Sequence, residues 1–146
     1  MENLRAYFFN NMYLTGIHAG IQAQHCTAEM FSKYDDSMEG YHPLYEWALE
    51  YKTTIILNAG YNSNLQRIES ELADWKGPYP WASFYESEDA LGCPCTSVGI
   101  ILPEKIYNYN KEKDISLHGF VMEGGVKLSD FDRWLIEELS QCNLMT

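Results

Sequence analysis

The segment ESEDALGCPC (residues 86–95) and the two residues after it carry the densest group of side chains that could take part in chemistry. This segment contains three carboxylates and two thiols, and the hydroxyls of Thr96 and Ser97 follow it directly. Two carboxylates can act as general acid and general base when burial separates their pKa values. If the chain is an enzyme, Glu86 and Glu88 are candidate catalytic residues, and Thr96, which follows them, is a third candidate. The alternative interpretation is a solvated loop.

A polar stripe runs along residues 16–34, a segment with helical periodicity. Its members, spaced to share one helix face, are His18, Gln22, His25 and Glu29. Histidine and glutamate at such spacing can ligate zinc or nickel. However, His18 and His25 are nearly two turns apart, about 10 Å by helical rise, which is too far for one ion. We interpret the stripe as a solvated face and predict no metal; in an enzyme, His25 is a further catalytic candidate.

The four cysteines do not form a familiar metal or redox motif. Only Pro94 separates Cys93 from Cys95, which is tighter than Cys-x-x-Cys spacing, and the sequence has no second close pair. The N-terminal residues lack the apolar run of a signal peptide, and no stretch reaches the ~18 apolar residues of a membrane span. We predict a cytoplasmic protein with reduced thiols and no cofactor.

Strand and helix patterns alternate along the chain that carries these residues. The expected strands are 4–14, 53–60, 80–87 and 96–103, and the expected helices are 16–34, 43–52 and 62–75, with Thr15, Pro43, and Asn62 or Ser63 at their starts. Beyond residue 107 we expect a polar linker, a strand over 115–122, a turn at Gly124 and Gly125, and a helix over 129–142 capped by Ser129.

This order predicts a single α/β domain over residues 1–146, because alternating strands and helices require crossover connections. We expect a four-stranded, mostly parallel or mixed sheet with helices on both faces. The core spans residues 1–106, and residues 107–146 form a C-terminal β-α extension.

The helix over 16–34 has another face that we expect to pack on the sheet. At about 100° per residue this face contains Ile17, Gly20, Ile21, Ala23, Gln24, Thr27, Ala28 and Phe31. Gln24 and Thr27 would then be buried and need partners, so we expect them to line a pocket against the strand ends. Alternatively, Thr27 bonds back to a carbonyl one turn earlier, and Gln24 lies at the rim.

Open α/β sheets bind ligands at the carboxyl ends of their strands, and Asn58 and Tyr61 lie at the end of the second strand. Together with the helix and the last core strand, they complete the set of candidate binding residues. This set is Gly20, Gln24, Thr27, Asn58, Tyr61 and Ser97.

The stretch GIQAQHCTAEMF (20–31) resembles the first helix of type II peptidyl-tRNA hydrolases, whose signature runs approximately Gly-Lys-x-Ala-Ala-Gln-Cys-Ser-His-Ala. CTSVGIILPEKI (95–106) looks like the last core strand of that family, and the elements between them follow its order. The resemblance covers about residues 5–106 and implies the fold of that family. It also implies that Gln24 and Thr96 match two of its site residues.

The same resemblance implies that the site has changed. The lysine of the family aligns with Gly20 and its histidine with Thr27, while its aspartate falls near Glu86 or Glu88. His25 stands where the family has a cysteine. A cation and an imidazole are therefore missing from their expected places, although ester hydrolysis needs an activated water and a stabilised oxyanion.

The charge balance bears on possible partners. Ten basic and twenty-one acidic residues give a net charge of −11. Binding to nucleic acid depends on a basic surface that neutralises phosphates, so this charge argues against tRNA, DNA and anionic membranes as partners. It is compatible with a basic protein surface or a small ligand.

Our first hypothesis is a non-catalytic protein that keeps the hydrolase-like fold and binds a small ligand or a protein partner. In its acidity and size it is similar to small bacteriophage proteins, some of which block host defence. The alternative is an enzyme: a peptidyl-tRNA hydrolase, or a hydrolase of another small ester or nucleotide-like substrate. A third hypothesis is an assembly component, a homodimer joined through the extension over 107–146.

Overall fold

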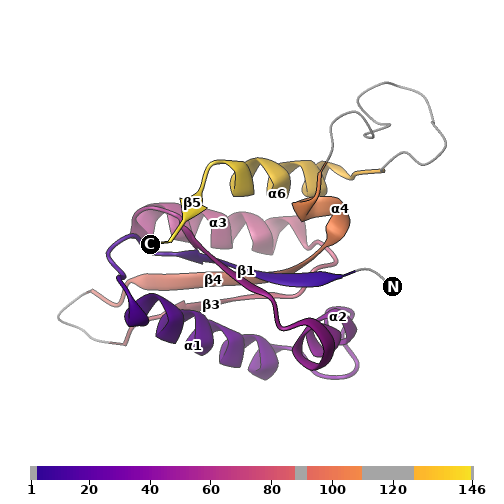
Figure 1. Cartoon of the computed structure of the whole chain (residues 1–146), viewed down its shortest axis with the longest axis horizontal. Coiled ribbons are helices and arrows are strands. Elements are labelled where there is room, and N and C mark those ends of the chain that lie inside the picture. The colour runs from indigo at the N-terminus through magenta and orange to yellow at the C-terminus, as the bar shows by residue number, and fades with distance from the viewer. Residues whose placement is uncertain (1–2, 88–91, 110–126, 146) are drawn as a thin grey trace.

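The computed structural model of the chain describes residues 3–87, 92–109 and 127–145 (Figure 1). The strands in this part of the chain are β1 (Leu4–Asn10), β2 (Thr54–Asn58), β3 (Trp81–Tyr85), β4 (Cys95–Pro103) and β5 (Asn143–Leu144). The helices are α1 (Ile17–Lys33), α2 (Tyr41–Glu46) with a following π-helical turn (Trp47–Tyr51), α3 (Asn62–Trp75), α4 (Glu104–Tyr107) and α6 (Asp130–Ser140). The strand expected over 115–122 and the turn at Gly124 and Gly125 lie outside the described residues.

The strands form one mixed sheet in the order β3-β4-β1-β2-β5. β1 and β2 run parallel, whereas the pairs β1–β4, β3–β4 and β2–β5 run antiparallel. The predicted α/β class and mixed sheet are confirmed, with five strands among the described residues where we expected four. The additional strand forms because α6 ends at Ser140, so that Asn143 and Leu144 can pair with Asn58 and Leu57.

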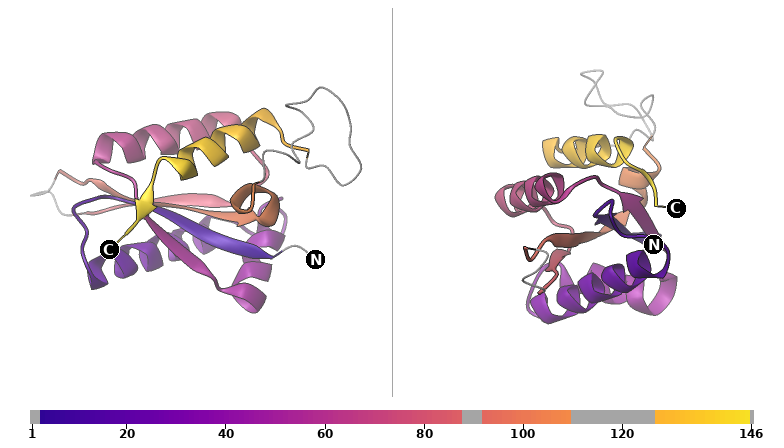
Figure 2. Two further views of the ribbon diagram at one scale, coloured as in Figure 1. Left: turned by 45° about the horizontal axis from the view of Figure 1, so that its top comes forward. Right: turned by 90° about the vertical axis from the view of Figure 1, so that its left-hand side faces the viewer.

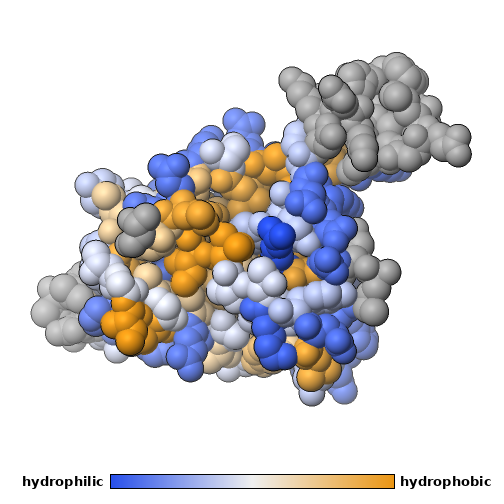
Figure 3. Space-filling model, viewed as in Figure 1, coloured by the Kyte–Doolittle hydropathy of each residue, from blue (hydrophilic) through white to orange (hydrophobic). Residues whose placement is uncertain are grey.

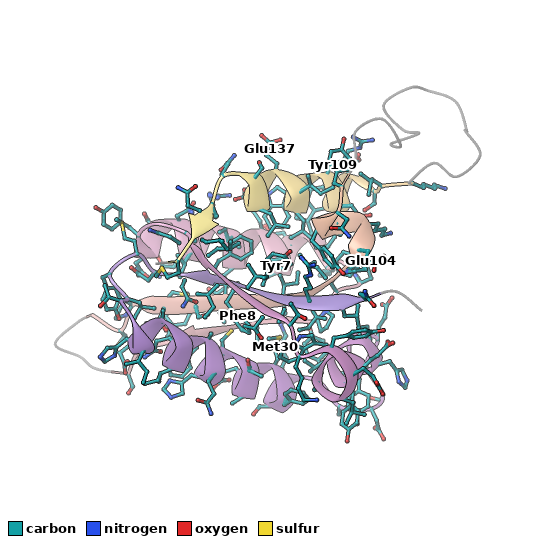
Figure 4. All side chains as sticks on the ribbon, in the orientation of Figure 1. Tyr7, Phe8, Met30, Glu104, Tyr109 and Glu137 are labelled. Carbon is teal, nitrogen blue, oxygen red and sulfur yellow. The ribbon has the colours of Figure 1, made fainter. Side chains whose placement is uncertain are left out.

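Helices cover both faces of the sheet, as predicted (Figures 1 and 2). α1 and α2 lie on one side, and α3, α4 and α6 lie on the other. Side chains alternate along β1: Tyr7 joins the core on the α3 side, and Phe8 joins the core on the α1 side with Met30 (Figure 4). None of the helices in the described residues combines the length and the apolar composition that crossing a membrane requires.

The orientation predicted for α1 is wrong. The buried residues of α1 are Ala19, Gln22, Ala23, Cys26 and Met30. Ile17 is 76% exposed, Ile21 37% and Phe31 39%, so most of the expected buried face points to solvent. The sequence offers two apolar arcs that meet at Ala23. The arc with smaller residues is buried because α1 packs close to β4: a Cβ added at Gly99 would lie 3.1 Å from the sulfur of Cys26.

The helix starts agree with the sequence at only one of four sites. α2 begins at Tyr41, so Pro43 is its third residue and not its first, as we had predicted. Ser129 caps α6 in a reciprocal capping box with Asp132, as expected. In contrast, α1 begins after Gly16 and α3 after Tyr61, and neither of these residues provides a side-chain cap. The predicted caps at Thr15 and at Asn62 or Ser63 are therefore wrong. Instead of capping α3, the amide oxygen of Asn62 accepts a hydrogen bond from the backbone N–H of Cys95.

The described part of the C-terminal extension belongs to the core. Leu128, Phe131 and Leu135 are buried in the same cluster as Ile68 and Leu72 of α3. Gly77 allows this close packing, since a Cβ added there would come within 2.6 Å of three ring atoms of Phe131. The apolar face of α6 is thus covered within one chain.

Candidate functional site

β4 begins with an irregularity that brings two hydroxyl residues to the same face of the sheet. Tyr85 pairs with Cys95 and Phe84 with Ser97, which leaves Thr96 as an extra residue in a β-bulge. As a result Thr96 and Ser97 both face α1: the Thr96 hydroxyl reaches Gln22, and Ser97 lies against the thiol of Cys26. Both side chains are completely buried.

A chain of hydrogen bonds connects the buried hydroxyl of Thr96 to a carboxylate. The Thr96 hydroxyl donates to the Gln22 side-chain oxygen at 3.0 Å, with the Phe84 carbonyl as a second acceptor at 3.3 Å. The Gln22 amide nitrogen donates in turn to Glu86 at 3.5 Å. Gln22 is buried, although we predicted it on the solvated stripe. An amide suits this bridge because it can donate and accept, but no signal in the sequence indicated the rotation of α1 that buries it.

Asn10 belongs to the same buried group and was not among the predicted residues. It is the cross-strand neighbour of Ser97, and its amide nitrogen donates to the Ala19 carbonyl at 2.9 Å. Among the described residues, the buried side-chain oxygen of Asn10 has no hydrogen-bond partner, and the buried hydroxyl of Ser97 meets only the weakly bonding thiol of Cys26. The signal available in the sequence was the pair Asn10–Asn11, directly after an apolar strand.

The buried thiols near this group are poorly suited to nucleophilic chemistry. Burial raises the pKa of Cys26 to about 12, and burial together with the Glu69 carboxylate raises the pKa of Cys95 to about 12. The thiolate is the reactive form of cysteine, so both residues are unreactive near neutral pH. The four cysteines form no disulfide.

An open pocket lies at the carboxyl ends of β1 and β2, beside the buried group. Its volume is about 330 Å³, and it is lined by Asn11, Tyr13, Tyr61, Asn62, Ser63 and Pro94. We call it the strand-end pocket. Tyr13 is 49% exposed and Tyr61 70% exposed. Open α/β sheets bind ligands in this position, and two aromatic rings with nearby amides can contact both apolar and polar groups.

Two asparagines fix the shape of the strand-end pocket. The Asn11 amide nitrogen donates to the Cys95 carbonyl at 3.1 Å, and the Asn62 oxygen accepts from the Cys95 N–H at 2.7 Å. The Asn11 oxygen also accepts from the backbone N–H of Tyr13 at 3.3 Å. The loops after β1 and β2 are therefore both tied to the start of β4, which holds the pocket walls together.

Glu86 connects the pocket electrostatically to the buried group. Burial, and to a smaller extent the negative charge of Glu86, raise the pKa of the Tyr13 phenol. The Glu86 carboxylate therefore interacts with Tyr13 through its negative charge and with Gln22 through a hydrogen bond. Glu86 is half-buried, and its backbone N–H donates to the Pro94 carbonyl at 2.9 Å.

The candidates on α1 do not join this group. His25 is exposed, and its ring packs on Phe84 at a centroid distance of 4.8 Å. Gly20 and Gln24 are exposed as well, so the expected burial of Gln24 is wrong. The Thr27 hydroxyl donates to the Ala23 carbonyl at 2.9 Å, which confirms the alternative interpretation for that residue.

The remaining candidates have separate places. The Asn58 oxygen accepts from the Gly60 N–H at 3.0 Å, and Asn58 lines a different pocket together with Glu138 and Asn143. Tyr61 lies in the strand-end pocket. Glu88 lies outside the described residues. Thr96, Ser97 and Glu86 are thus brought together, whereas His25, Gly20, Gln24 and Asn58 lie apart from them.

No protein-family model matches the sequence, and no curated protein matches it either.

Proposed function

We propose that this chain is a non-catalytic binding protein that holds its ligand in the strand-end pocket. One observation carries this proposal: the side chains suited to catalysis are engaged with each other, whereas the pocket beside them is open. Thr96 is buried and bonded to Gln22, which bonds to Glu86. No hydrogen bond within the described residues links His25 to either Thr96 or Glu86, so the candidates do not assemble a nucleophile with its base.

The lining of the pocket indicates the chemistry of the ligand. Tyr13 and Tyr61 offer exposed aromatic surface, which suits a planar apolar group, and the asparagines beside them suit a hydrogen-bonding group. The net charge of −11 disfavours tRNA or DNA, because repulsion opposes the approach of phosphates. A neutral or basic small molecule, or a single side chain of a basic protein partner, fits these conditions.

The alternative function is hydrolysis, and the position of Glu86 favours testing it. Its carboxylate acts on Tyr13, which lines the pocket, so a general base would be available beside a bound substrate. The helix motif that resembles type II peptidyl-tRNA hydrolases makes peptidyl-tRNA the substrate to test first. Other small esters and nucleotide-like compounds are the next class.

Binding to the strand-end pocket can be tested by NMR with a library of small aromatic fragments. We expect the fragments that bind to shift the backbone amide signals of Asn11, Tyr13 and residues 61–63. Tyr61→Ala should weaken this binding by roughly tenfold, since a stacked aromatic ring contributes about 1 kcal/mol or more. Tyr61→Phe keeps the ring and should bind as the wild type does.

Tyr61 is exposed, so both variants should remain folded, which their amide spectra would verify. Fragments that shift other regions and leave these signals unchanged would contradict the proposal. Equal affinities of the wild type and Tyr61→Ala would contradict it as well.

A further inference from the structure

We propose that a second pocket binds an organic cation, namely an ammonium or guanidinium group carried on an aliphatic chain. The volume of this pocket is about 320 Å³, and it is lined by Leu4, Glu39, Pro43, Glu46, Pro78, Tyr79, Ile101 and Pro103. We call it the carboxylate pocket, after its two glutamates. It lies where β1 begins, about 20 Å by strand rise from the strand-end pocket, and the two pockets share no lining residue. The proposal therefore goes beyond the binding function of the strand-end pocket.

The walls of the carboxylate pocket are largely apolar and rigid. Three of the lining residues are prolines, whose rings fix their own backbone φ angles. The Tyr79 ring is held in place, because its hydroxyl donates to Asp132 at 2.7 Å and the ring stacks on Phe131 at a centroid distance of 5.9 Å. Leu4 and Ile101 are buried core residues of β1 and β4. Such walls suit the methylene groups of an aliphatic chain.

α2 holds Glu46 at the edge of this pocket. Leu44, two residues earlier, is fully buried and anchors the short helix in the core. Before the helix, Gly40 packs so closely that a Cβ added there would lie 3.0 Å from the Cβ of Pro80. This contact ties the side of the pocket that carries Glu46 to the side that carries Tyr79. The carboxylate is therefore positioned before any ligand arrives.

One oxygen of Glu46 lacks a hydrogen-bond donor. Oε1 of Glu46 is buried and has no hydrogen-bond partner among the described residues. A buried carboxylate oxygen without a donor is costly, and such atoms are uncommon in folded proteins. An ammonium or guanidinium group in the pocket would supply both the donor and the opposite charge.

The negative charge around the pocket also favours a cation. Within the described part of the chain, none of the ion pairs involves Glu39 or Glu46. Burial, and after it the charges of Glu46, Glu50 and Glu104, raise the pKa of the Tyr51 phenol, so further carboxylates lie at this end of the molecule. α2 and α4 meet this end of the sheet (Figure 1), and hydrophilic residues predominate over α4 and the start of β1 in Figure 3.

Two cations adjoin lining residues in the sequence, but both are engaged elsewhere. Lys105 forms an ion pair with Asp132 at 3.4 Å. The guanidinium of Arg5 lies over the ring of Tyr107, 4.1 Å from its centroid. These side chains therefore do not neutralise the carboxylate pocket, and a cation from another molecule can do so.

NMR titration of the full-length protein with n-butylammonium and n-butylguanidinium tests the pocket. We expect both cations to shift the backbone amide signals of Glu39, Glu46 and Tyr79, with a Kd of about 1–10 mM. The uncharged 1-butanol has the same chain and should bind at least about tenfold more weakly, because it lacks the charge that the carboxylates attract.

Glu46→Gln keeps the size of the side chain and removes its charge. It should raise the Kd for both cations by about tenfold or more. Glu50→Gln makes the same change of charge at an exposed residue outside the pocket and should alter the Kd by less than about twofold. Amide spectra would verify that both variants are folded. Tyr61→Ala should leave this binding unchanged, so the proposals for the two pockets can fail separately.

Two capped tripeptides, Gly-Lys-Gly and Gly-Arg-Gly, distinguish the possible sources of the cation. A tripeptide that binds at least as tightly as the small cations, and that Glu46→Gln weakens equally, would identify a basic side chain of a protein as the ligand. Binding of the small cations alone would identify a free organic amine or guanidine. Both results uphold the proposed chemistry.

Equal affinities of the wild type and Glu46→Gln for the cations would overturn the proposal. So would 1-butanol that binds as tightly as n-butylammonium, or cations that leave the signals of Glu39, Glu46 and Tyr79 unchanged up to about 100 mM.

Discussion

Replacing Phe131 with alanine is expected to lower the free energy of unfolding by about 3–5 kcal/mol. The ring is buried between α3 and α6, and it packs with Tyr79, Trp134 and Trp75 at centroid distances from 5.8 to 5.9 Å. Gly77 lies directly against it. Rigid neighbours on several sides cannot close the cavity, so the cost should be near the upper part of this range. Urea denaturation followed by fluorescence measures it.

The matched control for this variant is Glu137→Ala on the same helix. Glu137 is exposed, as Figure 4 shows, and its replacement should change stability by less than about 0.5 kcal/mol. Similar stabilities of the two variants would mean that α6 is not part of the core. That result would favour the hypothesis of a homodimer joined through the extension over 107–146.

Replacing Thr96 with valine is expected to cost about 1–3 kcal/mol. Valine has nearly the same shape, so the change removes only the hydroxyl. The buried oxygen of Gln22 then loses the donor that now lies 3.0 Å away. An unsatisfied buried acceptor keeps its full cost of desolvation. Denaturant titration of the two proteins gives the difference.

The adjacent Ser97 provides the contrasting variant. Its hydroxyl is as buried as that of Thr96, but the polar group that it meets among the described residues is the weakly bonding thiol of Cys26. Ser97→Ala should therefore leave stability unchanged or raise it by up to about 1 kcal/mol. If both variants lost the same stability, the hydrogen-bond chain from Thr96 to Glu86 would not be the reason for the effect.

The sequence was sufficient to predict most of the fold. Apolar, β-branched runs such as 53–60 and 96–103 gave the strands, and the capping box at Ser129 gave the start of α6. β5 has only two residues and therefore no detectable pattern. The prediction of which side of α1 is buried was wrong because close packing at Gly99 decides it. The composition of the helix does not reveal that packing.

The candidate site was predicted less completely, for a related reason. Thr96, Ser97 and Glu86 are close in sequence, so they could be grouped from spacing alone. Gln22 was predicted on the solvated side of α1 but is buried. Asn10 was interpreted only as a residue of the first strand and not as part of a site. The walls of the strand-end pocket come from three connections along the chain. Their proximity depends on the strand order β4-β1-β2, which local patterns do not determine.

The rate of peptidyl-tRNA hydrolysis at low salt, measured for the wild type and for Glu86→Gln, tests the central claim most directly. Glutamine keeps the size of the side chain but cannot act as a base. A binding protein without catalysis should release the peptide no faster than buffer does, and the two proteins should give equal rates. Turnover by the wild type that Glu86→Gln abolishes, with its fold intact, would contradict the account and establish the chain as a hydrolase.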